Sequence, residues 1–367
     1  MPSFTSYLSK GGDPLEPPPG FAARYPDLAS RDLGGSVISA NDELFAPRQN
    51  LILPQPATHE ISAFGHTGKV YDGWETRRRR EPGFDWAIVR LGVPGILHGV
   101  VVDTAFFKGN YPPYVSVDAT SVEGYPDAEL FDRVPWTCLV PKSPCEGDTE
   151  NYYPIDNPKR WTHVRLNIFP DGGVARFRVH GEVVIDPRFL TTTVDLLALE
   201  NGGRLLSTSD AFYSTPENLI LASRARLMGE GWENARRRGA GNDWAVFKLA
   251  ARGEPTMIEV DTSYFVGNAP GEVRISAADE TVSDISEPSA WWDVVPRTPA
   301  LVDTRHRYVI PERRTATHLR LDVYPDGGLT RLRCFGELPE EVRKELYERF
   351  WHALPIEHQQ LLTRHPK

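Results

Sequence analysis

The chain has 367 residues, 40% of them hydrophobic and 25% charged, and this length predicts about two globular domains with sizeable cores. The formal net charge of -9 argues against a basic nucleic-acid-binding face, so we expect no nucleic-acid partner. Three cysteines, Cys138, Cys145 and Cys334, are too few for a disulfide framework and include no C-x-x-C pair for zinc. Because the sequence has neither a signal-peptide core nor the ~20 apolar residues of a membrane span, we expect a cytoplasmic protein without a membrane partner.

The predicted elements form five segments in chain order. They are a flexible segment at 1–30, a first β-rich module at 31–190, a linker at 191–207, a second module at 208–338 and a C-terminal helix at 339–367. In the last segment, Pro339 and two acidic residues suit a first helical turn, and apolar residues then follow at i, i+4 spacing. The apolar residues are Val342, Leu346, Phe350 and Leu354. This spacing predicts an amphipathic helix that docks on a domain or on a partner subunit.

Five short motifs occur twice, in the same order and at nearly the same spacing. The matched segments are 41–52 with 209–220, 73–80 with 231–238, 85–87 with 243–245, 102–110 with 260–268, and 162–182 with 317–337. The second pair reads G-W-E-x-x-R-R-R in both copies, and the fourth reads V-D-T-x-x-F-x-G-N. Self-similarity of this kind indicates a duplicated structural module.

The last of these motifs has the pattern of a β-hairpin. Val164, Leu166 and Ile168 alternate with polar residues, and the turn at 170–173 reads Pro-Asp-Gly-Gly. Period-two alternation on both sides of such a turn is typical of two antiparallel strands. Elsewhere the sequence has short β-branched runs bounded by many of its 30 glycines and 32 prolines. We therefore predict an all-β fold of two tandem jelly-roll β-sandwich domains with a short C-terminal helix.

Taken together, the ordered blocks G-W-E, R-R-R, D-W and D-T-x-x-F-x-G-N, present twice, are similar to the repeat of the allantoicase family. The resemblance covers roughly residues 30–337. It implies two jelly rolls of the galactose-binding type and hydrolysis of allantoate to ureidoglycolate and urea in purine degradation. It also implies a homo-oligomer. The resemblance implies no definite cofactor. Since some family members respond to metals, it leaves open a divalent metal such as Mn²⁺, with unknown ligands.

Release of one urea from allantoate requires a cation for the carboxylate, an acid for the departing nitrogen and a base for water. Residues of these types recur in both copies. The catalytic candidates are Glu75, Asp103, Lys108 and His163 in the first copy, and Glu233, Asp261 and His318 in the second. The substrate-binding candidates are Arg78, Arg79 and Asn110, with Arg236, Arg237 and Asn268. Arginine is proposed for the carboxylate because its guanidinium binds carboxylates in a bidentate manner.

The charged candidates each have a structural alternative. Successive residues of an extended segment point to opposite faces, so at most half of each arginine run can face one site. Glu75 and Glu233 are equally explained as salt-bridge partners of those arginines. Asp103 and Asp261 each end an apolar strand, where Asp-Thr also occurs as a cap that binds backbone N–H groups.

The polar candidates also have two interpretations. Asn110 and Asn268 either donate to the ureido oxygens or adopt a left-handed turn conformation. His163 and His318 either act as an acid or base near neutral pH or are hydrogen-bonded structural residues at the start of a strand. The sequence leaves these alternatives open.

The two copies differ at Lys108, which aligns with Val266. Because a duplicated module often keeps its chemistry in one copy, we hypothesise that the first copy supplies most of the site. Two rival functions remain: a tandem carbohydrate-binding protein without catalysis, and an inactive structural subunit of a purine-degradation assembly. Urea release from allantoate distinguishes the enzyme from both rivals.

Overall fold

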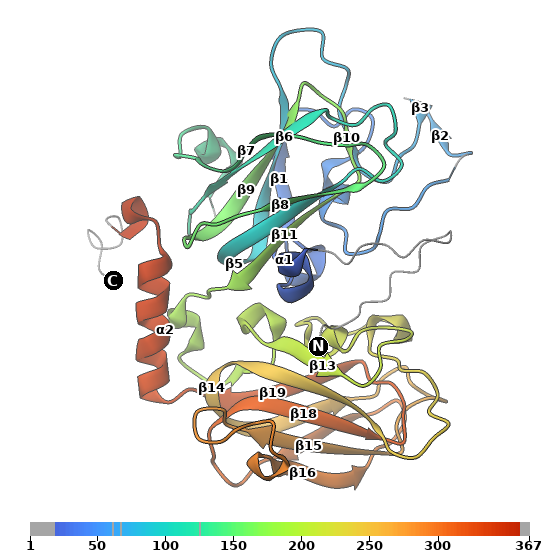
Figure 1. Ribbon diagram of the computed structural model, residues 1–367, viewed down its shortest axis with the longest axis vertical. Helices are drawn as coiled ribbons and strands as arrows, with labels where there is room; N and C mark the ends of the chain where they lie inside the picture. Colours follow the sequence, from blue (N-terminus) through green and yellow to red (C-terminus); the bar gives the residue numbers. More distant parts are fainter. Residues whose placement is uncertain (1–18, 61, 67, 125, 360–367) are drawn as a thin grey trace. The chain divides into compact units, whose positions relative to one another are not determined.

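The computed structural model describes residues 19–60, 62–66, 68–124 and 126–359 (Figure 1). These residues separate into two compact units. The N-terminal unit is the described part of Pro17–Ile185 together with that of Arg349–Lys367, and the C-terminal unit is Asp186–Glu348. The flexible segment predicted at 1–30 lies outside the described residues up to residue 18.

A 19-residue strand, β5 (Asp85–Asp103), organises the N-terminal unit. Its partner strands are β1 (Ser36–Ala40), β6 (Tyr114–Thr120), β7 (Thr137–Pro144), β8 (Glu150–Pro154), β9 (Arg160–Phe169) and β11 (Arg176–Val183). The first half of β5 pairs with β1 and β9, and its second half pairs with β8 and β11. The register shifts between Arg90 and Gly95, where β5 passes from one layer of the sandwich to the other. β6 and β7 extend the first layer beyond β9.

Short elements lie in the connections of this unit. They are α1 (Gly20–Arg24), η1 (Arg31–Leu33), η2 (Arg48–Ile52), β2 (Phe64–Gly65), β3 (Gly68–Lys69), β4 (Trp74–Glu75), η3 (Ala128–Asp132) and β10 (Gly173–Val174). β4 pairs with β10, and the N–H of Ala175 donates to the carbonyl oxygen of Asp103 at 2.7 Å. The G-W-E motif therefore lies at the end of the sandwich where β5 ends.

The C-terminal unit repeats this plan around another 19-residue strand, β14 (Asp243–Asp261). Its other strands are β12 (Val194–Asp195), β13 (Arg204–Thr208), β15 (Glu272–Ala278), β16 (Trp292–Pro299), β17 (Arg305–Val309), β18 (Ala316–Tyr324) and β19 (Arg331–Glu337). Its short 3-10 helices are η4 (Pro187–Leu190), η5 (Leu199–Asn201), η6 (Pro216–Ile220), η7 (Met228–Glu230) and η8 (Pro288–Ala290). β14 pairs with β13 and β18 in its first half, then with β17 and β19. The duplication seen in the sequence is therefore a duplication of strand pairing.

The all-β prediction is confirmed, because both units are built from strands and a short helix follows them. On β9, the apolar residues Val164, Leu166 and Ile168 are each 0% exposed, as the alternating pattern requires. Among the described residues, neither α-helix is long and apolar enough to cross a membrane.

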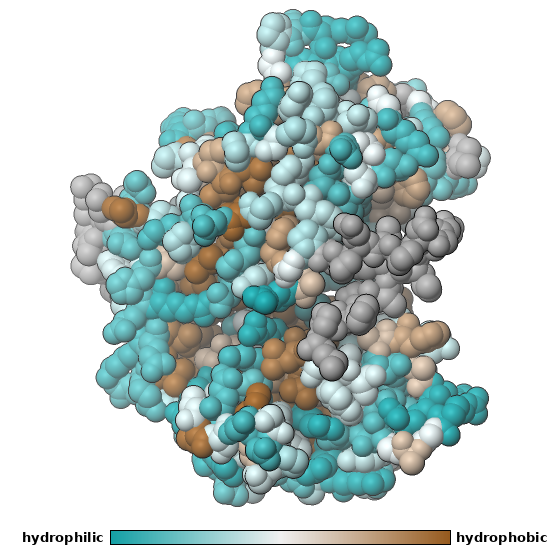
Figure 2. Space-filling view, viewed as in Figure 1, coloured by the Kyte–Doolittle hydropathy of each residue, from teal (hydrophilic) through white to brown (hydrophobic). Residues whose placement is uncertain are grey.

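The C-terminal helix, α2 (Glu340–Ala353), completes a core of the N-terminal unit with its last turns. Phe350, Ala353 and Leu354 pack with Val184, and all four are buried. The ammonium group of Lys159 donates to the carbonyl oxygens of His352 (3.0 Å) and Leu354 (3.1 Å). A cation there satisfies carbonyls that a helix end leaves unpaired. Figure 2 shows that the side of α2 turned to the viewer is largely hydrophilic, as expected of an amphipathic helix.

We expect Phe350→Ala to destabilise the protein, because it removes an aromatic side chain that is only 4% exposed. Truncation of a buried Phe typically costs about 3 kcal/mol or more of unfolding free energy. Urea denaturation of the full chain measures the change. Tyr347→Ala is the matched control, since Tyr347 lies on the same helix and is 53% exposed. Equal unfolding midpoints for both variants would contradict this role of Phe350.

Candidate active site

One end of each sandwich gathers most of the candidate residues. In the N-terminal unit, this end comprises β4, residues 103–110 and residues 171–176, and we call it the loop end. Glu75 lies opposite Gly173, and Asp103 lies opposite Arg176. The corresponding loop end of the C-terminal unit comprises residues 232–233, 261–268 and 326–331, where Trp232 pairs with Leu329.

Glu75 and Asn110 form a direct contact at this loop end. The amide nitrogen of Asn110 donates to Oε1 of Glu75 at 2.7 Å, and the carbonyl oxygen of Asn110 accepts the N–H of Gly173 at 2.7 Å. Burial raises the pKa of Glu75, although the hydrogen bond from Asn110 acts in the opposite direction. Among the described residues, Glu75 forms no ion pair with Arg78 or Arg79. A desolvated carboxylate with an amide donor suits proton transfer better than a structural salt bridge does.

The same contact recurs in the C-terminal unit. The amide nitrogen of Asn268 donates to Oε1 of Glu233 at 2.7 Å, and its carbonyl oxygen accepts the N–H of Gly328 at 2.8 Å. In both copies the left-handed residue of the loop is an aromatic rather than the asparagine: Phe106 has φ 71° and Tyr264 has φ 69°. The asparagines therefore serve as amide donors and not as left-handed turn residues.

Neighbouring arginines of the run at 78–79 point to opposite sides, as the alternation of an extended segment requires. The N–H of Arg79 donates to Asp171 at 2.8 Å, and its guanidinium donates to Asp85 at 2.6 Å. Arg79 is therefore held inside the loop end. Arg78 is exposed and has no ion pair among the described residues.

Arg237 repeats the structural role of Arg79. Its N–H donates to Asp326 at 2.6 Å, and its guanidinium binds Asp243, the first residue of β14. Arg236 is exposed, like Arg78. Of the four predicted substrate-binding arginines, Arg78 and Arg236 have side chains that are not engaged in these structural bonds.

Among the carboxyl groups at the loop end of the N-terminal unit, Asp103 has the largest pKa shift. Its Oδ1 accepts the N–H of Ala105 at 2.8 Å. Burial raises the pKa of Asp103 to about 6, and the neighbouring Glu150 carboxylate acts in the same direction. A carboxyl group in this range exchanges protons near neutral pH, as acid–base catalysis requires. Asp261, its counterpart, is 8% exposed and accepts both the N–H and the hydroxyl of Ser263.

Lys108 follows in the same loop and reaches solvent. Its ammonium lies 3.3 Å from Asp148, and its side chain is 77% exposed. Oδ1 of Asp148 accepts the N–H of Phe106 at 2.7 Å, which holds this bulky residue in its left-handed conformation. The loop end of the N-terminal unit thus presents a cation where the other copy has Val266.

The two candidate histidines, His163 and His318, do not lie with the other candidates at the loop ends. His163 lies opposite Arg90 in the first half of β5, about six residues or roughly 20 Å along β9 from the turn at the loop end. His163 is 2% exposed, and its Nδ1 lies 2.8 Å from the hydroxyl of Thr162. Burial lowers the pKa of His163 to about 4, and it also lowers the pKa of His318. His318 lies opposite Lys248 in the first half of β14 and is also buried, so the placement favours the structural alternative for both histidines.

The loop ends do not form a metal centre of recognisable geometry. No group of three or more His, Cys, Asp and Glu side chains that could hold a metal ion occurs in the part of the chain that the structure describes.

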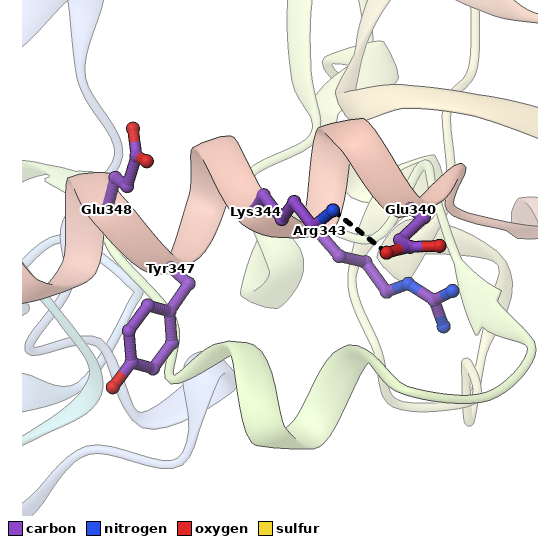
Figure 3. Close-up of a pocket in the computed structure, with 5 residues that line it drawn as sticks. All are labelled: Glu340, Arg343, Lys344, Tyr347 and Glu348. Atoms are coloured by element: carbon purple, nitrogen blue, oxygen red, sulfur yellow. Dashed lines mark ion pairs between the residues drawn. The ribbon is translucent and has the colours of Figure 1, made fainter.

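A shallow hollow lies on α2, and no candidate residue lines it (Figure 3). Its lining residues are Glu340, Arg343, Lys344, Tyr347 and Glu348. All five come from one helix, and Lys344 forms an ion pair with Glu340 at 2.9 Å. We assign this hollow no catalytic role.

The duplicated sequence of the two units matches a family model over most of its length. The model of the allantoicase repeat matches residues 26–184 and 194–339, which together span most of the chain. The chain belongs to the allantoicase family. It is 50% identical over 325 residues to the probable allantoicase of Nocardia farcinica, covering 88% of this chain and 96% of that one. It is 39% identical over 346 residues to the allantoicase of Dictyostelium discoideum, covering 91% and 92%.

The fold of this allantoicase family member is shared with a solved structure. The crystal structure of allantoicase from Saccharomyces cerevisiae is 34% identical in sequence and superposes with a TM-score of 0.74. The superposition covers 84% of this chain and 92% of the yeast chain.

Sequence reasoning missed Asp148 and Glu150, which lie close to the candidates. A signal for them exists: Asp-Thr occurs at 148–149 and again at 303–304, at the same distance before the closing hairpin. In both copies this aspartate accepts the N–H of the left-handed aromatic, with Asp303 accepting from Tyr264 at 2.8 Å. The dipeptide is followed by Glu150 in one copy and by Arg305 in the other.

Proposed function

We propose that the protein is an allantoicase, a hydrolase that converts allantoate and water to ureidoglycolate and urea. The observation that carries this proposal is the match to the allantoicase repeat over both sandwiches, with acid–base carboxylates at the repeated loop ends. The alternative of a non-catalytic carbohydrate-binding protein is not favoured, because relatives named allantoicase match along most of the chain.

The reaction makes and breaks few bonds. The bond between the central carbon of allantoate and one ureido nitrogen breaks, and that nitrogen takes a proton and leaves as urea. The hydroxyl of a water molecule bonds to the central carbon, and the other proton of the water passes to a base. One acid and one base therefore account for both protons.

We assign these two roles to Asp103 and Glu75. A general acid must still hold its proton at the working pH, and a raised pKa lets a carboxyl group do so. Burial raises the pKa of Asp103 to about 6, so Asp103 donates to the departing urea nitrogen. Glu75, positioned by Asn110, takes the proton from water.

The anionic end of the substrate needs cations that solvent can reach. Arg78 and Lys108 are both exposed at the loop end of the N-terminal unit, and we assign them to the allantoate carboxylate. Lys108 has no cationic counterpart in the C-terminal unit, where Val266 replaces it. We therefore place the active site in the N-terminal sandwich.

Purified protein incubated with allantoate tests the proposal directly. We expect urea and ureidoglycolate to form in equal amounts. Absence of urea, with and without added Mn²⁺, would leave only the non-enzymatic rivals. The same assay after dialysis against a chelator tests the metal prediction. Sedimentation analysis tests the predicted homo-oligomer, and cell fractionation tests the cytoplasmic location.

Replacing one arginine at a time tests the division of the arginine run. Arg78→Ala is expected to raise KM for allantoate by about 10-fold or more, since a hydrogen bond to a charged group is worth about 1.5–3 kcal/mol. Its melting temperature should equal that of the wild type. Arg79→Ala should instead lower the melting temperature, because it leaves the buried Asp85 carboxylate without its cationic partner and with only the amide of Asn41. Reversal of these two outcomes would contradict the assignment.

A further inference from the structure

The two copies place opposite charges beside the same aspartate. In the pairing of β5 with β8, Asp103 lies directly opposite Glu150. In the pairing of β14 with β17, Asp261 lies directly opposite Arg305. Like charges in directly opposed positions destabilise the ionised pair, whereas opposite charges stabilise it. The strand pairing therefore places a repelling charge beside Asp103 and an attracting charge beside Asp261.

The residue two positions later acts in the same direction. Oδ1 of Asp103 accepts the N–H of Ala105 at 2.8 Å, and alanine has no side-chain donor. Oδ1 of Asp261 accepts both the N–H of Ser263 at 2.9 Å and its hydroxyl at 2.6 Å. Each added donor stabilises the carboxylate over the protonated acid. The two copies therefore differ at two positions that contact the same aspartate: Glu150 against Arg305, and Ala105 against Ser263.

The remaining charged neighbours are similar in the two copies except for the Glu259–Arg307 ion pair of the C-terminal copy, which aligns with Val101 and Tyr152. From β11, Arg176 and Arg178 face Asp103 and favour its ionised form. From β19, Arg331 lies opposite Asp261. Glu259, two residues before Asp261 on β14, binds Arg307 at 2.9 Å and lies 3.7 Å from Arg305. Arginines on the second neighbouring strand are therefore common to both copies. The surroundings of the aspartate differ in the residue opposite it, on β8 or β17, and in the residue two positions after it in the chain.

We propose that Glu150 is a positioning residue that keeps Asp103 able to donate a proton, whereas Arg305 and Ser263 fix Asp261 as a structural carboxylate. Proton donation then belongs to the N-terminal sandwich alone. This inference rests on the proposed allantoate hydrolysis and goes beyond it, because it explains why two nearly identical loop ends differ in chemistry. The burial of Asp103, which raises its pKa to about 6, is consistent with this division.

Exchanging the residues between copies tests the proposal. Glu150→Arg and Ala105→Ser each give the N-terminal copy the residue of the C-terminal copy. Each is expected to move the alkaline limb of the kcat/KM profile to lower pH by about one unit, a loss of about tenfold at pH values above that limb. Ala105→Ser leaves the net charge unchanged, so its effect cannot arise from altered attraction of the anionic substrate. The reverse exchanges, Arg305→Glu and Ser263→Ala, should leave the profile unchanged.

A second measurement separates this inference from the proposed function. Carboxyl NMR of protein carrying ¹³C-labelled aspartate, with the Asp103 signal assigned from Asp103→Asn, gives the titration midpoint of Asp103 without turnover. We expect Glu150→Arg and Ala105→Ser to lower this midpoint, at an unchanged melting temperature. If neither exchange moves the midpoint or the kcat/KM limb, the inference is overturned while allantoate hydrolysis stands. If the wild type releases no urea, the proposed function itself fails.

Discussion

Asp103→Asn is expected to lower kcat for allantoate by about 10²–10⁴-fold, the usual contribution of a general acid. Asparagine keeps an oxygen for the N–H of Ala105 but has no proton to donate to the departing nitrogen. In the wild type, donation requires the protonated carboxyl group. We therefore expect kcat/KM to fall tenfold per pH unit above the pKa of Asp103, about 6, and to lose this limb in the variant. Initial rates of urea release between acidic and alkaline pH measure both effects.

Asp261→Asn is the matched control for this prediction. Asp261 occupies the same position of the repeat, and its amide replacement still accepts the N–H of Ser263. We expect turnover like that of the wild type. An equal loss in both variants would contradict the placement of the chemistry in one sandwich. A normal rate for Asp103→Asn would remove Asp103 from the mechanism altogether.

Glu75→Gln is expected to lower kcat by about 10²-fold or more with little change in KM, because it removes the base and keeps the shape of the side chain. The glutamine carbonyl oxygen still accepts the amide N–H of Asn110, so the loop end is not disturbed. Steady-state kinetics of urea release separates kcat from KM.

The corresponding control is Glu233→Gln, which changes the contact with Asn268 in the same way. We expect this variant to turn over allantoate normally. If Glu233→Gln loses activity and Glu75→Gln does not, the C-terminal sandwich contains the working site. A rise in KM without a fall in kcat for Glu75→Gln would indicate that Glu75 binds substrate and does not accept a proton.

Much of the fold could be predicted because its signals are local. The hairpin at Val164–Val179 alternates with period two around a Pro-Asp-Gly turn, and both copies contain it. The spacing of Val342, Phe350 and Leu354 indicated the C-terminal helix in the same way. The repeated motifs also identified Glu75 and Asn110, which are 35 residues apart in sequence and form a hydrogen bond.

The rest of the candidate site depends on strand register, which the sequence does not display. That Glu150 lies opposite Asp103 follows from the pairing of β8 with β5, two strands far apart in the chain. That Arg79 binds Asp171 and Asp85 also requires the folded turn. His163 was a reasonable candidate by residue type, but its position along β9 separates it from the loop end.

The packing of Phe350 and Leu354 on Val184 has a consequence for biosynthesis. A ribosome releases the N-terminal sandwich long before it releases the residues that complete this part of its core. Until then Val184 remains uncovered, although domains usually fold in the order in which they are made. Nascent chains halted after residue 340 should therefore recruit chaperones more strongly than full-length chains do.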